Sequence, residues 1–120
     1  ILLGLVGSEM CIRDRNDLMR PSLYSARHKI ENLVESSEKK DLYSVVGPVC
    51  ETADSFGSDF EVSANAGDYL VVYSAGAYGS SMGSNYNTRL KPAEILVDQK
   101  SHKVIRKAET FDDLIKEEEL

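Results

Sequence analysis

The chain has 120 residues, of which 42% are hydrophobic and 28% charged, so it suits one globular domain and is neither disordered nor fibrous. Its formal net charge of −6 excludes the extended basic surface that nucleic-acid binding needs, so no nucleic-acid partner is expected. Two cysteines cannot supply a four-cysteine zinc site or a disulfide framework, so we expect no metal and a reduced, cytoplasmic setting.

The first fifteen residues read as a segment foreign to the domain. The chain begins with Ile rather than Met, and the stretch GLVGSEMCIRDR (residues 4–15) has neither helical nor strand periodicity. The apolar start over residues 1–7 is far shorter than the ~20 residues of a membrane span and lacks the basic region of a signal peptide, so neither membrane attachment nor export is expected. We therefore expect residues 1–15 to be a non-native sequencing artefact and residues 16–120 to form the domain. A genuine short strand is the alternative.

Beyond residue 16, apolar and β-branched runs predict four strands. They are Leu42–Val49, Asp68–Ser74, Glu94–Asp98 and Lys103–Lys107. Because Pro48 lacks a backbone N–H, the first strand should lie at a sheet edge or end there. The near-continuous aromatic run of the second strand is typical of burial on both faces. The polar residues between the last two strands predict a hairpin loop.

Only the C-terminal end has the pattern of a helix. Thr110, with Asp113 three residues later, fits a capping box at its start. The apolar residues on one face of this helix are Phe111, Leu114 and Ile115. The Ser- and Gly-rich stretches 55–67 and 74–88 predict connections. The expected fold class is therefore mainly β with one C-terminal helix.

Three segments carry residues suited to chemistry, each with a structural alternative. Arg20 can bind a carboxylate through two parallel hydrogen bonds, or be a surface arginine before a turn. Cys50 lies beside Glu51, whose charge disfavours the thiolate, so the thiol suits a proton donor better than a nucleophile; a buried structural cysteine is the alternative. In the Gly-rich segment 74–87, Tyr78 and Tyr86 can stack on a ligand, although a plain flexible loop fits equally well.

Taken in order, three segments closely resemble the C-terminal part of the diaminopimelate decarboxylase family. They are NDLMRPSLYSARH (16–28), VVGPVCETAD (45–54) and GDYLVVYSAGAYGSSMGSNYNTRLKPAEILV (67–97). This family belongs to the pyridoxal-phosphate-dependent ornithine, diaminopimelate and arginine decarboxylases, which have an alanine-racemase-like fold. Its members pair an N-terminal (β/α)8 barrel with a C-terminal β-sandwich or barrel domain. The resemblance implies that this chain is the second domain and that the barrel is missing from it.

The resemblance also implies roles for five residues. Cys50 matches the proton donor of the decarboxylation, and Glu51 matches the acid that contacts the distal amino group of the substrate. Arg20 and Tyr24 match residues that bind near the distal carboxylate. Tyr78 matches a residue that touches both substrate and cofactor. The implied cofactor is pyridoxal 5′-phosphate, whose attachment lysine is not in this chain.

The implied reaction converts meso-diaminopimelate to L-lysine and carbon dioxide in a homodimer with a composite active site. The chain alone should be inactive. A related decarboxylase of ornithine, arginine or carboxynorspermidine is one alternative, although ornithine enzymes typically have Asp where Glu51 stands. A non-catalytic paralogue that binds a protein partner is the other.

Overall fold

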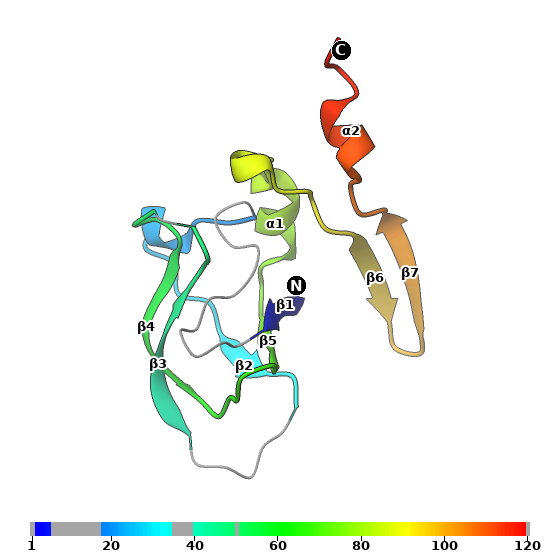
Figure 1. The fold of residues 1–120 in the computed structure, drawn as a ribbon. Helices are drawn as coiled ribbons and strands as arrows, with labels where there is room; N and C mark the ends of the chain where they lie inside the picture. The colour runs from blue at the N-terminus through cyan, green and yellow to red at the C-terminus, as the bar shows by residue number, and fades with distance from the viewer. Residues whose placement is uncertain (1, 6–17, 35–39, 50, 120) are drawn as a thin grey trace.

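The structure, a computed structural model, describes residues 2–5, 18–34, 40–49 and 51–119 (Figure 1). Within these residues most regular structure is β. The strands are β1 (Leu2–Leu5), β2 (Ile30–Asn32), β3 (Asp41–Val46), β4 (Ser55–Val62), β5 (Tyr69–Val72), β6 (Glu94–Asp98) and β7 (Ser101–Arg106). The helices are α1 (Gly76–Met82) and α2 (Phe111–Ile115), and two short 3₁₀ turns are η1 (Pro21–Leu23) and η2 (Tyr86–Thr88). The mainly β fold class is confirmed.

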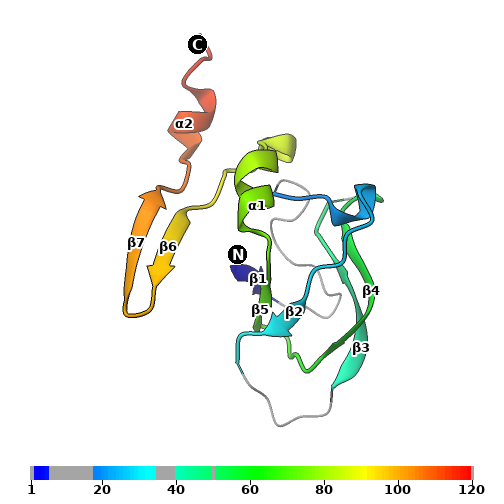
Figure 2. The same cartoon turned by 180° about the vertical axis from the view of Figure 1, so that it is seen from behind.

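The strands form three antiparallel groups. β5 lies between β1 and β2, β3 pairs with β4, and β6 pairs with β7. Figures 1 and 2 both show β6, β7 and α2 projecting away from the other strands. Every described side chain of β7 is exposed. The hydrophobic core therefore lies in the body built from the first five strands.

The core gathers side chains from both groups of strands in this body. Its buried members are Leu18, Met19, Ile30, Val45, Phe56, Phe60, Val62, Leu70, Val72 and Ala75. In β5, Leu70 and Val72 are buried whereas Tyr69 is exposed, as is Tyr73, which follows the strand. The prediction that this strand is buried on both faces is therefore wrong. One face packs on the core, and the exposed tyrosines lie on the other face.

Two stretches expected to be connections contain regular structure. β4 forms within 55–67, where positive φ angles at Gly57 (110°) and Asp59 (61°) break the simple alternation of apolar residues. α1 forms within 74–88 from Gly and Ser, which are weak helix formers, so the expectation of a single helix is wrong. Tertiary packing overrides local propensity here, because short helices depend on packing for stability.

The predicted capped helix near the C-terminus is confirmed, and the predicted hairpin is present with a shorter loop. β6 has the predicted bounds, but β7 begins at Ser101 rather than Lys103, so Asp98 pairs with Ser101 across a two-residue turn. At α2 the Thr110 hydroxyl accepts a hydrogen bond from the Asp113 backbone N–H at 3.2 Å. The Asp113 carboxylate accepts one from the Thr110 backbone N–H at 2.9 Å. The Thr110 hydroxyl also donates to this carboxylate at 2.7 Å. That hydrogen bond, followed by the one from the Thr110 backbone N–H, lowers the pKa of Asp113.

The predicted foreign segment includes β1, which pairs with β5 through Leu2 and Val71 and through Leu3 and Leu70. Backbone pairing needs only N–H and C=O groups, so any short apolar segment can add to an open strand edge. The pairing therefore does not bear on whether residues 1–15 are native. That assignment stays a prediction, and residues 6–15 lie outside the described part of the chain.

Candidate functional site

The first group of predicted site residues surrounds the 3₁₀ turn η1. Arg20 immediately precedes this turn, and buried Pro21 occupies its first position, where a missing N–H costs no hydrogen bond. Tyr24 closes the turn through its N–H and the carbonyl of Pro21, at 3.3 Å. The Arg-Pro-x-Leu-Tyr sequence therefore places Arg20 and Tyr24 at the two ends of one turn.

Tyr24 and Tyr78 stack on one another although they lie far apart in the sequence. Their ring centroids are 5.3 Å apart, with an interplanar angle of 13°. The ring of His28 meets Tyr78 edge-on at 6.1 Å, and it meets Phe56 edge-on at the same distance. We call Tyr24, His28, Phe56 and Tyr78 the aromatic cluster. It fixes α1 against η1 and so joins two of the predicted substrate-binding residues.

His28 is a buried member of the cluster that the sequence analysis missed. Its Nδ1 lies 3.0 Å from the backbone carbonyl oxygen of Tyr73. Because a carbonyl only accepts, Nδ1 carries the proton of this hydrogen bond. Among the described residues, Nε2 has no hydrogen-bond partner. The two partners are 45 residues apart, so no local spacing could have indicated this contact.

The hydroxyl of Tyr24 is also buried, and no side chain of the described residues hydrogen-bonds to it. Burial raises the pKa of Tyr24, and the neighbouring Tyr78 raises it further. The phenol therefore stays protonated at neutral pH and can donate a hydrogen bond. A donor of this kind suits a carboxylate or phosphate oxygen.

Arg20 is half-buried and lies near a second tyrosine. Its Cζ is 5.9 Å from the centroid of the Tyr86 ring, within the range of a cation–π contact. Tyr86 begins η2, which follows α1 along the chain. The Gly-rich segment thus supplies two tyrosines to the surroundings of η1, one stacked on Tyr24 and one beside Arg20.

Glu51 lies in the loop between β3 and β4, residues 47–54, which we call the β3–β4 loop. Glu51 is half-buried, and the loop is bound to η1 because the Ser22 hydroxyl donates to the carbonyl of Ala53 at 2.9 Å. The structure therefore brings Arg20, Tyr24 and Tyr78 together and places the loop that carries Glu51 against the same turn. Cys50, the predicted proton donor, lies outside the described residues.

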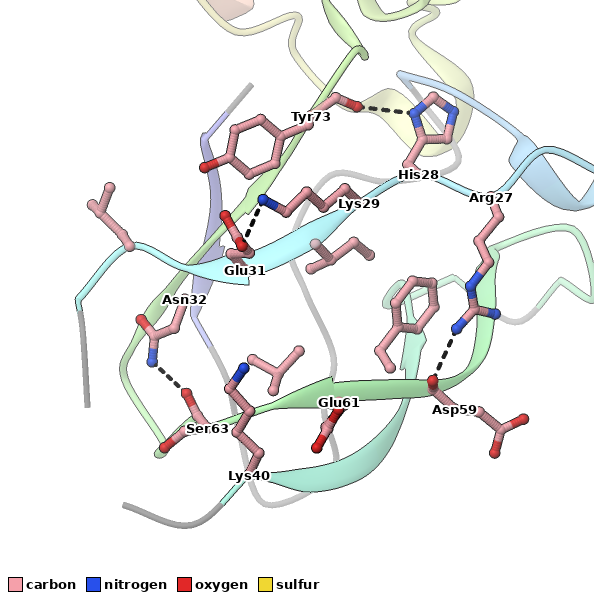
Figure 3. A pocket seen from close by; sticks show the side chains of 14 residues that line it. Arg27, His28, Lys29, Glu31, Asn32, Lys40, Asp59, Glu61, Ser63 and Tyr73 are labelled. Atoms are coloured by element: carbon pink, nitrogen blue, oxygen red, sulfur yellow. Dashed lines mark hydrogen bonds and ion pairs between the residues drawn. The ribbon is translucent and has the colours of Figure 1, made fainter. Parts of the chain in front are cut away.

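A hollow of about 920 Å³ lies between β2 and β4 (Figure 3), and His28 of the aromatic cluster is among the residues that line it. Several of its polar groups bind one another. Lys29 pairs with Glu31 at 2.7 Å, and Arg27 donates to the carbonyl of Asp59 at 2.8 Å. The contact with Glu31 raises the pKa of Lys29, and Lys29 lowers that of Glu31. None of the four described site residues lines this hollow, so we do not include it in the candidate site.

Two classes of site find no support within the described ranges. No group of three or more His, Cys, Asp or Glu side chains there could hold a metal ion. Helices in the same ranges are all too short or too polar to cross a bilayer.

Comparison with curated proteins finds relatives that are close to 50% identical to this chain over the aligned residues. The diaminopimelate decarboxylase of Neisseria meningitidis serogroup B is 50% identical over 98 residues, which cover 81% of this chain and 23% of that protein. The diaminopimelate decarboxylase of Haemophilus influenzae is 49% identical over 100 residues, covering 82% of this chain and 24% of that protein. The chain thus spans about a quarter of the length of these relatives.

Solved structures give the same result. Diaminopimelate decarboxylase from Methanocaldococcus jannaschii, in co-complex with L-lysine, superposes with a TM-score of 0.85 at 34% identity, covering 99% of this chain and 29% of that one. The structure of AQ1208 from Aquifex aeolicus has a TM-score of 0.83 at 40% identity and covers 97% of this chain and 31% of that one. Residues 11–76 match the family described as pyridoxal-dependent decarboxylase, C-terminal sheet domain. The chain therefore belongs to the pyridoxal-dependent decarboxylase family and corresponds to its C-terminal sheet domain.

Proposed function

We propose that this chain is the C-terminal domain of an enzyme that converts meso-diaminopimelate to L-lysine and carbon dioxide. The observation that carries the proposal is the gathering of Arg20, Tyr24 and Tyr78 around η1, against the loop that holds Glu51. The relatives named diaminopimelate decarboxylase support the same reaction, as does the solved relative in co-complex with L-lysine.

Diaminopimelate has an amino-acid group at each end, and only one end reacts. The spectator end carries a carboxylate and an ammonium, which call for a cation and an anion in the site. Arg20 offers a planar guanidinium for the carboxylate, and the nearby Tyr24 hydroxyl can donate a further hydrogen bond. Glu51 offers a carboxylate for the ammonium. Binding energy from the spectator end then orients the reacting end.

The described residues also fit a pyridoxal phosphate beside them. Tyr78 presents a ring and a hydroxyl on α1 and is 44% exposed, so an aromatic cofactor can reach it. When bound, the cofactor supplies an electron sink for the bond that loses carbon dioxide. This chain contributes the groups around that centre. In our proposal the Cys50 thiol gives a proton to the carbon left after decarboxylation, while Tyr78 holds substrate and cofactor together.

The remaining assignments complete the proposal. Residues 1–15 are non-native sequence, residues 16–120 are the C-terminal domain, and a (β/α)8 barrel in the complete enzyme carries the cofactor lysine. The enzyme works in the cytoplasm as a homodimer in which Cys50 and Glu51 reach the site of the partner subunit. A mixing experiment tests the dimer, because two variants inactivated in different domains should regain activity when their subunits exchange.

A chimeric enzyme tests the proposed reaction. In it, residues 16–120 of this chain replace the matching C-terminal segment of the Neisseria meningitidis serogroup B relative. We expect it to release carbon dioxide from meso-diaminopimelate and to discriminate against ornithine and arginine by about 10²-fold or more, because neither offers both groups of the spectator end at the required distance. The measurement is carbon dioxide release with each substrate under the same conditions.

The 120-residue chain alone is the matched control, and it should neither bind pyridoxal phosphate nor release carbon dioxide. Preference of the chimeric enzyme for ornithine or arginine would instead support the related decarboxylases. A folded, cofactor-loaded chimera with no activity on any of these substrates would support the non-catalytic paralogue.

A further inference from the structure

The carboxylate of Asp54 is buried inside the β3–β4 loop. Asp54 is only 3% exposed, and its Oδ2 accepts a hydrogen bond from the backbone N–H of Val49 at 2.7 Å. The backbone N–H of Gly47 also donates to the carbonyl of Asp54 at 2.9 Å. A buried carboxyl group needs such hydrogen bonds, because a polar group that leaves water without them is costly to bury. Asp54 therefore closes the loop through both its side chain and its backbone.

Gly47 shows how closely this carboxylate approaches the opposite side of the loop. A Cβ added at Gly47 would lie 2.0 Å from Asp54 Oδ1 and 2.2 Å from Oδ2. These are far inside any allowed contact, so any side chain at position 47 would displace the carboxylate. The loop closes in its present form because position 47 has no side chain.

Asp54 hydrogen-bonds to both neighbours of position 50. Its carboxyl group accepts a hydrogen bond from the N–H of Val49, and its backbone N–H donates to the carbonyl of Glu51 at 3.0 Å. The N–H of Glu51 donates in turn to the carbonyl of Val49 at 2.8 Å. The next residue toward β4, Ala53, is bound by Ser22 of η1. The segment on both sides of position 50 is thus fixed relative to the turn that carries Arg20 and Tyr24.

We propose that Asp54 is a positioning residue of the decarboxylase, holding Val49 and Glu51, the two neighbours of Cys50, at fixed places beside η1. This inference rests on the proposed function. The hydrogen bond from the Val49 N–H to the Asp54 carboxyl group suits the task because it is short, at 2.7 Å, and shielded from water. Misplacing a reacting group by about 1 Å can cost ~10²-fold in rate. Asp54 touches neither substrate nor cofactor in this role and acts through the loop.

Gly47→Ala is a first test, made in the chimeric enzyme. The added methyl group should push the carboxylate away and lower kcat by about 10-fold or more, because overpacking in a closed site forces backbone shifts. In an Asp54→Ala background the same change should have less than about a twofold effect, because the space is then open. Gly76→Ala is the matched control, since a Cβ there meets nothing within 4 Å. Equal effects of Gly47→Ala in both backgrounds would contradict the proposed contact.

Asp54 itself is tested with two substitutions and a control in the chimeric enzyme. Asp54→Ala should lower kcat for meso-diaminopimelate by about 10- to 100-fold. Asp54→Asn keeps an acceptor oxygen of nearly the same shape and should recover part of that loss. Asp59→Asn is the matched control, because it makes the same change at a residue of β4 that is exposed. Asparagine also tolerates the positive φ of position 59. The double variant Asp54→Ala, Glu51→Gln should lose less kcat than the product of the fold-losses measured for the two single variants. A purely structural role would make the losses multiply.

Alkylation of Cys50 separates this inference from the proposed function. The rate of the reaction of Cys50 with iodoacetamide can be followed by mass spectrometry of the peptide that contains this residue. The measurement does not depend on decarboxylase activity. Asp54→Ala should change this rate by about fivefold or more relative to Asp59→Asn, as expected when one buried hydrogen bond of the loop is lost. Asp54→Asn, which keeps the acceptor, should lie between them and keeps the test decisive if the alanine variant does not fold. Rates unchanged in both Asp54 variants would overturn the inference, whereas an inactive parent chimera would overturn only the proposed function.

Discussion

Replacing Cys50 with alanine in the chimeric enzyme should lower turnover of meso-diaminopimelate by about 10²- to 10⁴-fold, the range for a positioned general acid. The KM and the binding of pyridoxal phosphate should hardly change, because the thiol acts on the substrate carbon only after carbon dioxide has left. The measurement is a steady-state comparison of kcat and KM, with cofactor content determined from absorbance.

The pH dependence gives this prediction a second and independent readout. A general acid works only while it is protonated, so activity should fall as the pH rises through the pKa of the thiol, which is ~8.5 for an unperturbed cysteine. The Cys50→Ala enzyme should lack that decline in its residual activity. Cys50→Ser, which keeps the shape but is a far weaker acid, serves as the matched control and should be similarly slow. Turnover of the alanine variant at the parent rate would mean that another group, such as water, delivers the proton.

Local sequence patterns were sufficient for the elements whose signals are local. The hairpin over β6 and β7 and the Thr110–Asp113 capping box depend on residues within a few positions of one another. The segment 68–74 could be recognised as a strand from its β-branched and aromatic residues, but its burial on one face depends on what packs against it. Pattern therefore predicts that an element exists better than it predicts what surrounds it.

The features that were missed depend on distant parts of the chain. β4 carries two residues with positive φ that disturb its alternation. The helix α1 contains four Gly and Ser residues, which are weak helix formers, and its Tyr78 belongs to the aromatic cluster. The contact of His28 with the Tyr73 carbonyl spans 45 residues. Asp54 ends the segment VVGPVCETAD (45–54), but the sequence does not show that its carboxyl group lies against Gly47 and accepts a hydrogen bond from the N–H of Val49. Closure of this kind leaves no periodic signal in the sequence.

Arg20→Lys and Glu51→Gln in the chimeric enzyme should each lower kcat/KM for meso-diaminopimelate by about 10-fold or more. Charge-assisted hydrogen bonds contribute ~1.5–3 kcal/mol, and the partner left unpaired in a desolvated site adds to the loss. Lysine at position 20 keeps the charge but lacks the planar pair of donors, so this substitution should not behave as conservative. Gln at position 51 keeps the size of the side chain but removes its negative charge.

The two substitutions can be told apart with competitive inhibitors that carry only part of the spectator end. L-lysine keeps both the carboxylate and the ammonium of that end, so each substitution should weaken its inhibition. Cadaverine keeps an ammonium without a carboxylate, and 6-aminohexanoate keeps a carboxylate without the second ammonium. Arg20→Lys should therefore weaken inhibition by 6-aminohexanoate about 10-fold and leave inhibition by cadaverine nearly unchanged. Glu51→Gln should instead weaken inhibition by cadaverine and leave that by 6-aminohexanoate nearly unchanged. If Arg20→Lys weakened cadaverine as much as 6-aminohexanoate, Arg20 would not be the ligand of the carboxylate, because only the second inhibitor presents one.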